Sequence, residues 1–175
     1  TWLSADIPDS VCDLSGYSLF RRDRLERAGG GVICYVRSSI NSRLVDPPIT
    51  NLEGFEVLWV AVRPKILPRP MCTMIMSVVY CPPWYDAGLK RSLSNYIVSG
   101  IDFFNRTYNN AGFLIVGDFN SLDTSFLAGC YALNNWLNDV LEEARSWTKY
   151  LLTSQTDLLK VKYCHHSANQ ITIVF

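Results

Sequence analysis

Apolar residues in this chain gather in several short runs along the sequence. A run rich in β-branched residues follows a glycine cluster at 29–31 and predicts a strand at 32–36. Two further runs, at 57–62 and 71–80, do not alternate cleanly between apolar and polar positions, so we expect strands that are buried on both faces. Shorter apolar runs at 113–116 and 171–175 predict two more strands.

One longer stretch has the period of a helix. Apolar side chains recur at three- and four-residue steps over 89–108, which places them on one helical face. Asp86 is the expected N-cap, and the turn at 109–112 is expected to end the helix. Weaker patterns predict a helix at 122–133 and a strand at 150–153. Strands in succession around a helix favour an α+β protein of two packed sheets with helices outside.

Composition narrows the class of protein. A chain of 175 residues with 49% apolar residues is typical of one globular domain with a sizeable core. The formal net charge is zero. A protein that neutralises many phosphates is usually basic, so this balance argues against broad wrapping of nucleic acid and leaves room for a few local phosphate contacts.

Cysteine spacing and hydropathy indicate the compartment in which the protein is expected to function. The six cysteines lie far apart without a C-x-x-C pair, so we expect reduced, mostly buried thiols rather than a zinc ribbon. No apolar run reaches the roughly 18 residues that span a bilayer, and no signal peptide is visible. We therefore expect an intracellular protein, nuclear or cytoplasmic. The chain opens at Thr1 and stops inside an apolar run, so we expect it to be incomplete at both ends.

The segment with the clearest chemistry follows the apolar run at 113–116. Gly117 is expected to let the backbone turn, so that Asp118 and Asn120 lie at the mouth of the strand. A carboxylate there can orient a water or bind a hard cation, and the amide can donate to a phosphate oxygen. The alternative is a strand end followed by an ordinary Asx-turn.

Several short motifs occur in a fixed order around this segment. They are Thr1-Trp2-Leu3, Gly16-Tyr17, Arg21-Arg22-Asp23-Arg24, Gly29-Gly30-Gly31-Val32, Val79-Tyr80-Cys81-Pro82-Pro83 and Gly117-Asp118-Phe119-Asn120. The series resembles the endonuclease/exonuclease/phosphatase superfamily, and within it the endonucleases of LINE-type (non-LTR) retrotransposons, over residues 1–123. The resemblance implies a single domain over 1–175 with a DNase I-like fold. That fold is a four-layer α/β sandwich of two packed, mainly antiparallel sheets flanked by helices, here truncated at both ends.

The resemblance also implies roles for three residues at the reaction centre. Asp118 would activate or position the attacking water, or help to hold a metal ion, and Mg²⁺ is the implied cofactor. Asn120 would bind the scissile phosphate, and Tyr80 would hydrogen-bond the same phosphate. The alternative for Tyr80 is an aromatic at the edge of the core with its hydroxyl in water.

Two arginines are the candidate nucleic-acid contacts. Arg21 and Arg24 would bind the phosphate backbone of DNA, or else pair with Asp23 in a surface cluster. The implied partners are DNA and, in an intact element, a reverse transcriptase domain downstream. We expect a monomer with no membrane association.

Several catalytic positions of the family are missing. Its metal-binding Glu would fall directly before Thr1, so the ligand set is incomplete and the remaining metal ligands are unknown. Lys149 stands where the family has an Asp, and Ala168 and Asn169 stand where it has an Asp-His pair. A shift of register would bring His165 or His166 to that position. Loss of groups that act together predicts impaired hydrolysis.

Three functions therefore compete. The first is a divalent-metal-dependent DNA endonuclease of retrotransposon type, impaired in this copy. The second is a catalytically silent remnant that keeps the fold and binds nucleic acid. The third is a phosphatase or small-phosphodiester hydrolase of the same superfamily, against which the R-x-D-R and G-G-G-V motifs argue.

Overall fold

The computed structural model describes residues 3, 5–24, 29–67, 69–123 and 172–174 of the chain. The elements occur in the order α1 (Asp9–Cys12), β1 (Tyr17–Arg22), β2 (Val32–Arg37), β3 (Asn41–Leu44), β4 (Glu56–Arg63), β5 (Thr73–Tyr80), α2 (Ala87–Thr107), β6 (Ala111–Asp118) and β7 (Thr172–Val174). The described part is a mixed α+β structure, as the pattern of apolar runs predicts.

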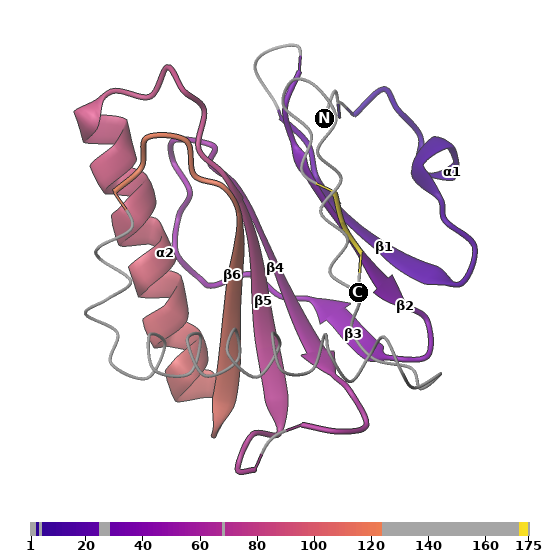
Figure 1. Cartoon of the computed structure of the whole chain (residues 1–175). Helices are drawn as coiled ribbons and strands as arrows, with labels where there is room; N and C mark the ends of the chain where they lie inside the picture. Colours follow the sequence, from indigo (N-terminus) through magenta and orange to yellow (C-terminus); the bar gives the residue numbers. More distant parts are fainter. Residues whose placement is uncertain (1–2, 4, 25–28, 68, 124–171, 175) are drawn as a thin grey trace, which may run out of the picture.

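Two sheets face each other (Figure 1). One has the strand order β1-β2-β7 and the other β3-β4-β5-β6. Within the described residues, β1–β2, β3–β4 and β4–β5 pair antiparallel, whereas β2–β7 and β5–β6 pair parallel. Helix α2 connects β5 to β6 and lies on the outer face of the larger sheet (Figure 1). Helix α2 and the two sheets therefore form three layers in the described part of the chain.

The central strands β4 and β5 of the larger sheet are buried on both faces. On the face toward α2, Trp59 packs among residues of the helix such as Leu93 and Phe104. On the opposite face, Leu58 and Met76 pack with Val36 of β2. Because successive side chains of a strand point to opposite faces, β4 and β5 are apolar at almost every position, and this confirms the expectation from their continuous runs.

Helix α2 begins at its predicted cap. The Asp86 side chain accepts a hydrogen bond from the Leu89 backbone N–H at 2.8 Å. The helix is amphipathic, with its apolar face on the sheet. Among the residues that the structure describes, no helix is long and apolar enough to cross a membrane.

The predicted strands at 32–36, 57–62, 71–80, 113–116 and 171–175 correspond to β2, β4, β5, β6 and β7. Leu122 and Asp123 are not helical, and the rest of the helix predicted at 122–133 lies outside the described residues, as does the strand predicted at 150–153. One local expectation is wrong. Gly117 does not turn the chain, because β6 continues through it to Asp118.

Candidate functional site

Three polar residues lie in a row across one end of the larger sheet. Glu56 of β4 is the register partner of Tyr80 of β5, and Tyr80 is the register partner of Asp118 of β6. Residues paired in this way have side chains on the same face of a sheet. Tyr80 packs in the core between the two sheets, so this row lies on the face that looks toward the smaller sheet.

The backbone of Cys81 fixes the end of β6 beside the end of β5. The Cys81 N–H donates to the Asp118 carbonyl at 2.9 Å, and its own carbonyl accepts from Asn120 Nδ2 at 2.8 Å. Asn120 has a φ of 45°, so the chain leaves its extended course there. One side-chain N–H of Asn120 is thus used to tie two loops together, and the second is left for another acceptor.

Asp118 also makes the turn that the alternative interpretation foresaw. Its Oδ1 accepts from the Asn120 backbone N–H at 3.1 Å, which is an Asx-turn. Asp118 is half-buried, and within the described residues its second carboxylate oxygen accepts no hydrogen bond. The turn therefore holds the carboxylate in place and leaves one oxygen open to a water or a ligand.

Gly117 permits the close approach of β6 to β5. Its φ is 153°, and a Cβ atom built on it would lie 1.8 Å from the Val79 carbonyl oxygen. No side chain fits in that space. The glycine of the G-D-x-N segment is therefore needed for strand pairing rather than for a turn, and it sets the position of the carboxylate that follows.

The Tyr80 hydroxyl is enclosed. The residue is 2% exposed, and its buried O–H has no hydrogen-bond acceptor in the described part of the chain. Burial raises the pKa of Tyr80 above its ordinary value, while the positive charge of Arg24 opposes this rise. The alternative with the hydroxyl in water does not describe this structure. A buried O–H without an acceptor is costly, so Tyr80 is ready to donate to any acceptor that reaches it.

Glu56 is the second carboxylate of the row, and both of its oxygens accept hydrogen bonds. Arg24 Nε and Nη2 lie 2.8 and 2.5 Å from Glu56 Oε1, and the Gly31 N–H donates to Oε2. Glu56 is 3% exposed. Gly30 is part of the same unit, because a Cβ atom there would lie 2.2 Å from Arg24 Cζ. The R-x-D-R and triple-glycine motifs thus meet at one buried ion pair.

Arg24 also lies against two aromatic rings. Its Cζ is 5.6 Å from the centre of the Tyr80 ring and 5.1 Å from that of the Trp84 ring. Trp84 is 49% exposed, in contrast to Tyr80. It belongs to the turn after β5, in which the Tyr85 N–H donates to the Pro82 carbonyl. The guanidinium therefore connects the buried part of the site to an exposed indole.

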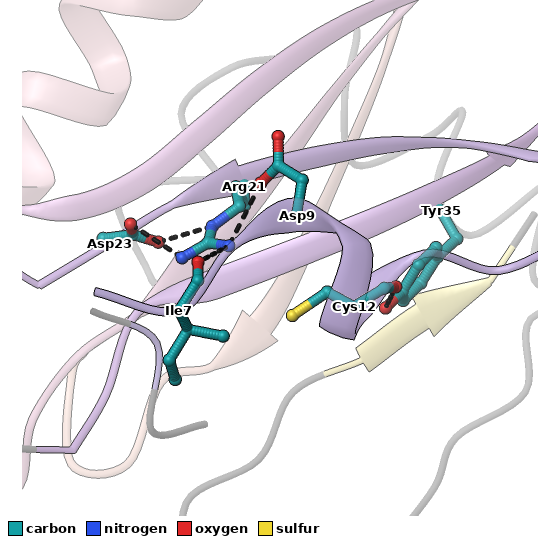
Figure 2. Close-up of polar contacts among 6 residues, drawn as sticks. All are labelled: Ile7, Asp9, Cys12, Arg21, Asp23 and Tyr35. Carbon is teal, nitrogen blue, oxygen red and sulfur yellow. Dashed lines mark hydrogen bonds and ion pairs between the residues drawn. The ribbon is translucent and has the colours of Figure 1, made fainter. Parts of the chain in front are cut away.

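Arg21 lies in a separate ion-pair cluster (Figure 2). Its Nε and Nη2 each bind a carboxylate oxygen of Asp23 at 2.8 Å, and its Nη1 binds the Ile7 carbonyl and Asp9 Oδ1. The hydrogen bond to Asp23 is the main cause that raises the pKa of Arg21, and burial opposes it. This arrangement corresponds to the alternative in which Arg21 pairs with Asp23. Arg24 pairs instead with Glu56.

The described residues do not complete a Mg²⁺ site. Magnesium requires several oxygen ligands at close range, and in the described ranges no three His, Cys, Asp or Glu side chains gather around one point. Glu56 is bound to Arg24 and Gly31, so Asp118 offers the free carboxylate oxygen of this row.

The structure brings Asp118, Asn120 and Tyr80 to one end of the sheet and adds Glu56 and Trp84, which the sequence analysis did not select. An isolated acidic residue at the start of an otherwise apolar strand was the available signal for Glu56. Lys149, Ala168, Asn169, His165 and His166 lie outside the described residues.

A groove of about 280 Å³ lies on the other face of the larger sheet, between β3 and the end of α2. Arg43 lines it and binds the Tyr108 hydroxyl at 2.8 Å. None of the residues named above for the candidate site lines this groove.

Comparison with known proteins adds no relative. Protein-family models, curated proteins and solved structures were each compared with this chain, and none matched.

Proposed function

We propose that this chain is an endonuclease domain of the endonuclease/exonuclease/phosphatase superfamily, of the LINE-type retrotransposon kind, with impaired phosphodiester hydrolysis in this copy. The observation that carries the proposal is the pairing of Tyr80 with Asp118 on one sheet face, with Asn120 tied beside them. The order of the sequence motifs and the two facing sheets support the finer assignment to a DNase I-like fold.

Each side chain has a definite task in the proposed reaction. The open oxygen of Asp118 accepts a hydrogen bond from the attacking water and orients it toward phosphorus. The second N–H of Asn120 and the O–H of Tyr80 donate to oxygens of the phosphate, where negative charge develops. The Asn120 amide is held in advance by the Cys81 carbonyl, and a donor that does not have to reorganise during the reaction stabilises the transition state.

The same geometry explains why this copy would be slow. The Tyr80 hydroxyl is covered, so a phosphate reaches it only after the neighbouring groups move. Glu56, the other carboxylate of the row, is neutralised by Arg24. The positions of the family's acid–base residues hold Lys149, Ala168 and Asn169, which cannot exchange a proton as an Asp-His couple does.

Plasmid nicking in Mg²⁺ tests this proposal. The native chain is compared with a restored chain that carries a Glu before Thr1 and the changes Lys149→Asp, Ala168→Asp and Asn169→His. We expect restoration to increase the nicking rate by about 100-fold or more, because general acid–base catalysis alone is worth roughly 10² to 10⁴. Chelation of Mg²⁺ should remove the gain.

The matched control is the restored chain with Asp118→Asn, which keeps the shape of the side chain and removes its charge. Urea unfolding first establishes that both restored chains are equally stable. If the restored chain does not nick faster than its Asp118→Asn version, the endonuclease proposal fails. Hydrolysis of small phosphodiesters but not of plasmid would instead identify the small-substrate alternative.

The silent remnant is the second candidate, and the covered Tyr80 hydroxyl and the Arg24–Glu56 ion pair favour it. It predicts that the native chain binds labelled DNA without cleaving it and that restoration adds no nicking. Binding measured at low and high salt tests the first part, because contacts to phosphate weaken as salt rises.

A further inference from the structure

Trp84 is an exposed aromatic residue whose ring contacts a buried arginine, Arg24. Half of its surface is open, yet Arg24 lies over one face of its ring at 5.1 Å. Arg24 cannot easily move, because its guanidinium is bound to the buried Glu56. A cation over an aromatic face is attracted to it. The indole is therefore fixed in position before any ligand arrives, and little conformational freedom is lost when a flat group stacks on it.

Trp84 also lies close to the candidate phosphate site. The centres of its ring and of the Tyr80 ring are 5.1 and 5.6 Å from the same Arg24 Cζ, so they are no more than about 11 Å apart. Tyr80 in turn pairs with Asp118. A single strand whose phosphate lies at Tyr80 and Asp118 therefore has a neighbouring base within reach of Trp84.

The arginines near the site do little to attract a phosphate backbone. Arg21 is bound to Asp23 and Asp9, Arg22 to Asp46, and Arg24 to Glu56. The whole chain has no formal net charge. Affinity for a nucleic acid must therefore come largely from contacts other than charge. Stacking of bases on aromatic side chains is such a contact, and it tolerates any base sequence.

We propose that Trp84, supported by Arg24, is a stacking site for an unpaired nucleobase next to the phosphate that Tyr80 and Asp118 would hold. The inference rests on the proposed function for the position of that phosphate. It narrows the substrate class to DNA in which at least one base is unstacked beside the scissile bond, as in a single strand or in a locally opened stretch of a supercoiled plasmid.

Two fluorescein-labelled strands of equal length and charge test this inference with the full native chain. One is a thymidine oligonucleotide, and the other has the same sugar-phosphate backbone with every base removed. Fluorescence anisotropy gives the affinity for each. We expect the native chain to prefer the strand with bases, and Trp84→Leu to weaken binding of that strand by roughly 5-fold or more, since stacking on an aromatic residue contributes on this scale. Trp84→Phe should keep most of the preference.

The matched control is Tyr108→Leu, which removes the ring from the Arg43–Tyr108 contact on the other face of the sheet. It should keep the preference for bases. Equal binding of both strands by the native chain, or a preference that persists in Trp84→Leu, overturns the inference. The result is independent of nicking, so loss of the base preference and loss of the Asp118-dependent activity are separate failures.

Discussion

Arg24 and Glu56 form an enclosed ion pair, with Arg24 Nη2 2.5 Å from Glu56 Oε1 and side chains that are 10% and 4% exposed. The two residues come from the arginine-rich segment and from the start of β4. The Gly31 N–H completes the coordination of the carboxylate. Removal of one member of such a pair leaves the other charge buried without compensation, which is far more costly than the loss of a surface pair.

We therefore predict that Glu56→Gln lowers the free energy of unfolding by about 3 kcal/mol, measured by urea denaturation. The matched control is Asp46→Asn, which breaks the more exposed pair with Arg22 and should cost about 1 kcal/mol or less. The double variant Arg24→Met with Glu56→Gln should recover part of the loss, because no buried charge remains. An equal cost for Glu56→Gln and Asp46→Asn would contradict this account.

Gly117→Ala should be among the most destabilising small substitutions in the chain. The added Cβ would overlap the Val79 carbonyl oxygen, and the φ of 153° is unfavourable for any side chain. We expect a loss of more than about 3 kcal/mol, seen as a lower urea midpoint. Gly54→Ala is the control, since Gly54 also has a positive φ but nothing lies within 4 Å of its Cβ position. It should cost about 1 kcal/mol, and a similar loss at both positions would refute the argument from close approach.

Tyr80→Phe should stabilise the native chain, because it removes a buried hydroxyl whose O–H has no acceptor. We expect a gain of about 1 kcal/mol in the free energy of unfolding. In the restored chain the same change should slow nicking, because a donor to the phosphate is lost. Tyr35→Phe is the opposite control, since Tyr35 Oη donates to the Cys12 carbonyl at 2.6 Å (Figure 2) and its loss should destabilise by about 1 kcal/mol. A loss of stability in both variants would show that Tyr80 has an acceptor.

The free energy of unfolding should decrease at high pH, and the titration of Tyr85 should account for part of the decrease. Burial raises the pKa of Tyr85 to about 12 from the ordinary value of 10.0. Between these two values the unfolded chain loses the phenol proton while the folded chain keeps it, so the free energy of unfolding decreases as pH rises. Below the unfolded pKa this contribution is fully present. Urea denaturation at pH 9, 10 and 11 should therefore give a smaller decrease for Tyr85→Phe than for the native chain, and an equal decrease would exclude the effect.

The sequence predicts the buried strands and the helix of this protein better than its exposed or charged strands. Continuous apolar runs located β4 and β5, because a strand that is buried on both faces must be apolar throughout. The helical period and Asp86 located α2. By contrast, the apolar pattern does not predict β3, because that strand is short and mostly exposed. It does not predict β1 either, because β1 ends in Arg21 and Arg22, whose charges are paired with Asp23 and Asp9 and with Asp46.

The candidate site was predictable where chemistry follows a local motif. Asp118 and Asn120 stand at the end of an apolar strand, and that context was visible in the sequence. The sequence does not single out Glu56, because its role depends on Arg24 and Gly31. These two residues lie next to β1 and β2 of the smaller sheet, far from Glu56 in the sequence. The proximity of Trp84 to Arg24 is likewise a property of tertiary packing. A buried charge pair leaves no periodic trace in the sequence, so structure is needed to reveal it.

The length of helix α2 fixes the alignment of β5, which ends at Tyr80, with β6, which ends at Asp118. The helix joins β5 to β6, and it is clamped on the sheet by contacts such as that between Trp59 and Phe104. Deleting one codon inside the helix would rotate every later residue by about 100° around the helix axis. The packing of Phe104 on Trp59 and the alignment of Tyr80 with Asp118 could then not both be kept. The coding sequence for 87–107 should thus tolerate far fewer in-frame length changes than that for the connection at 64–72.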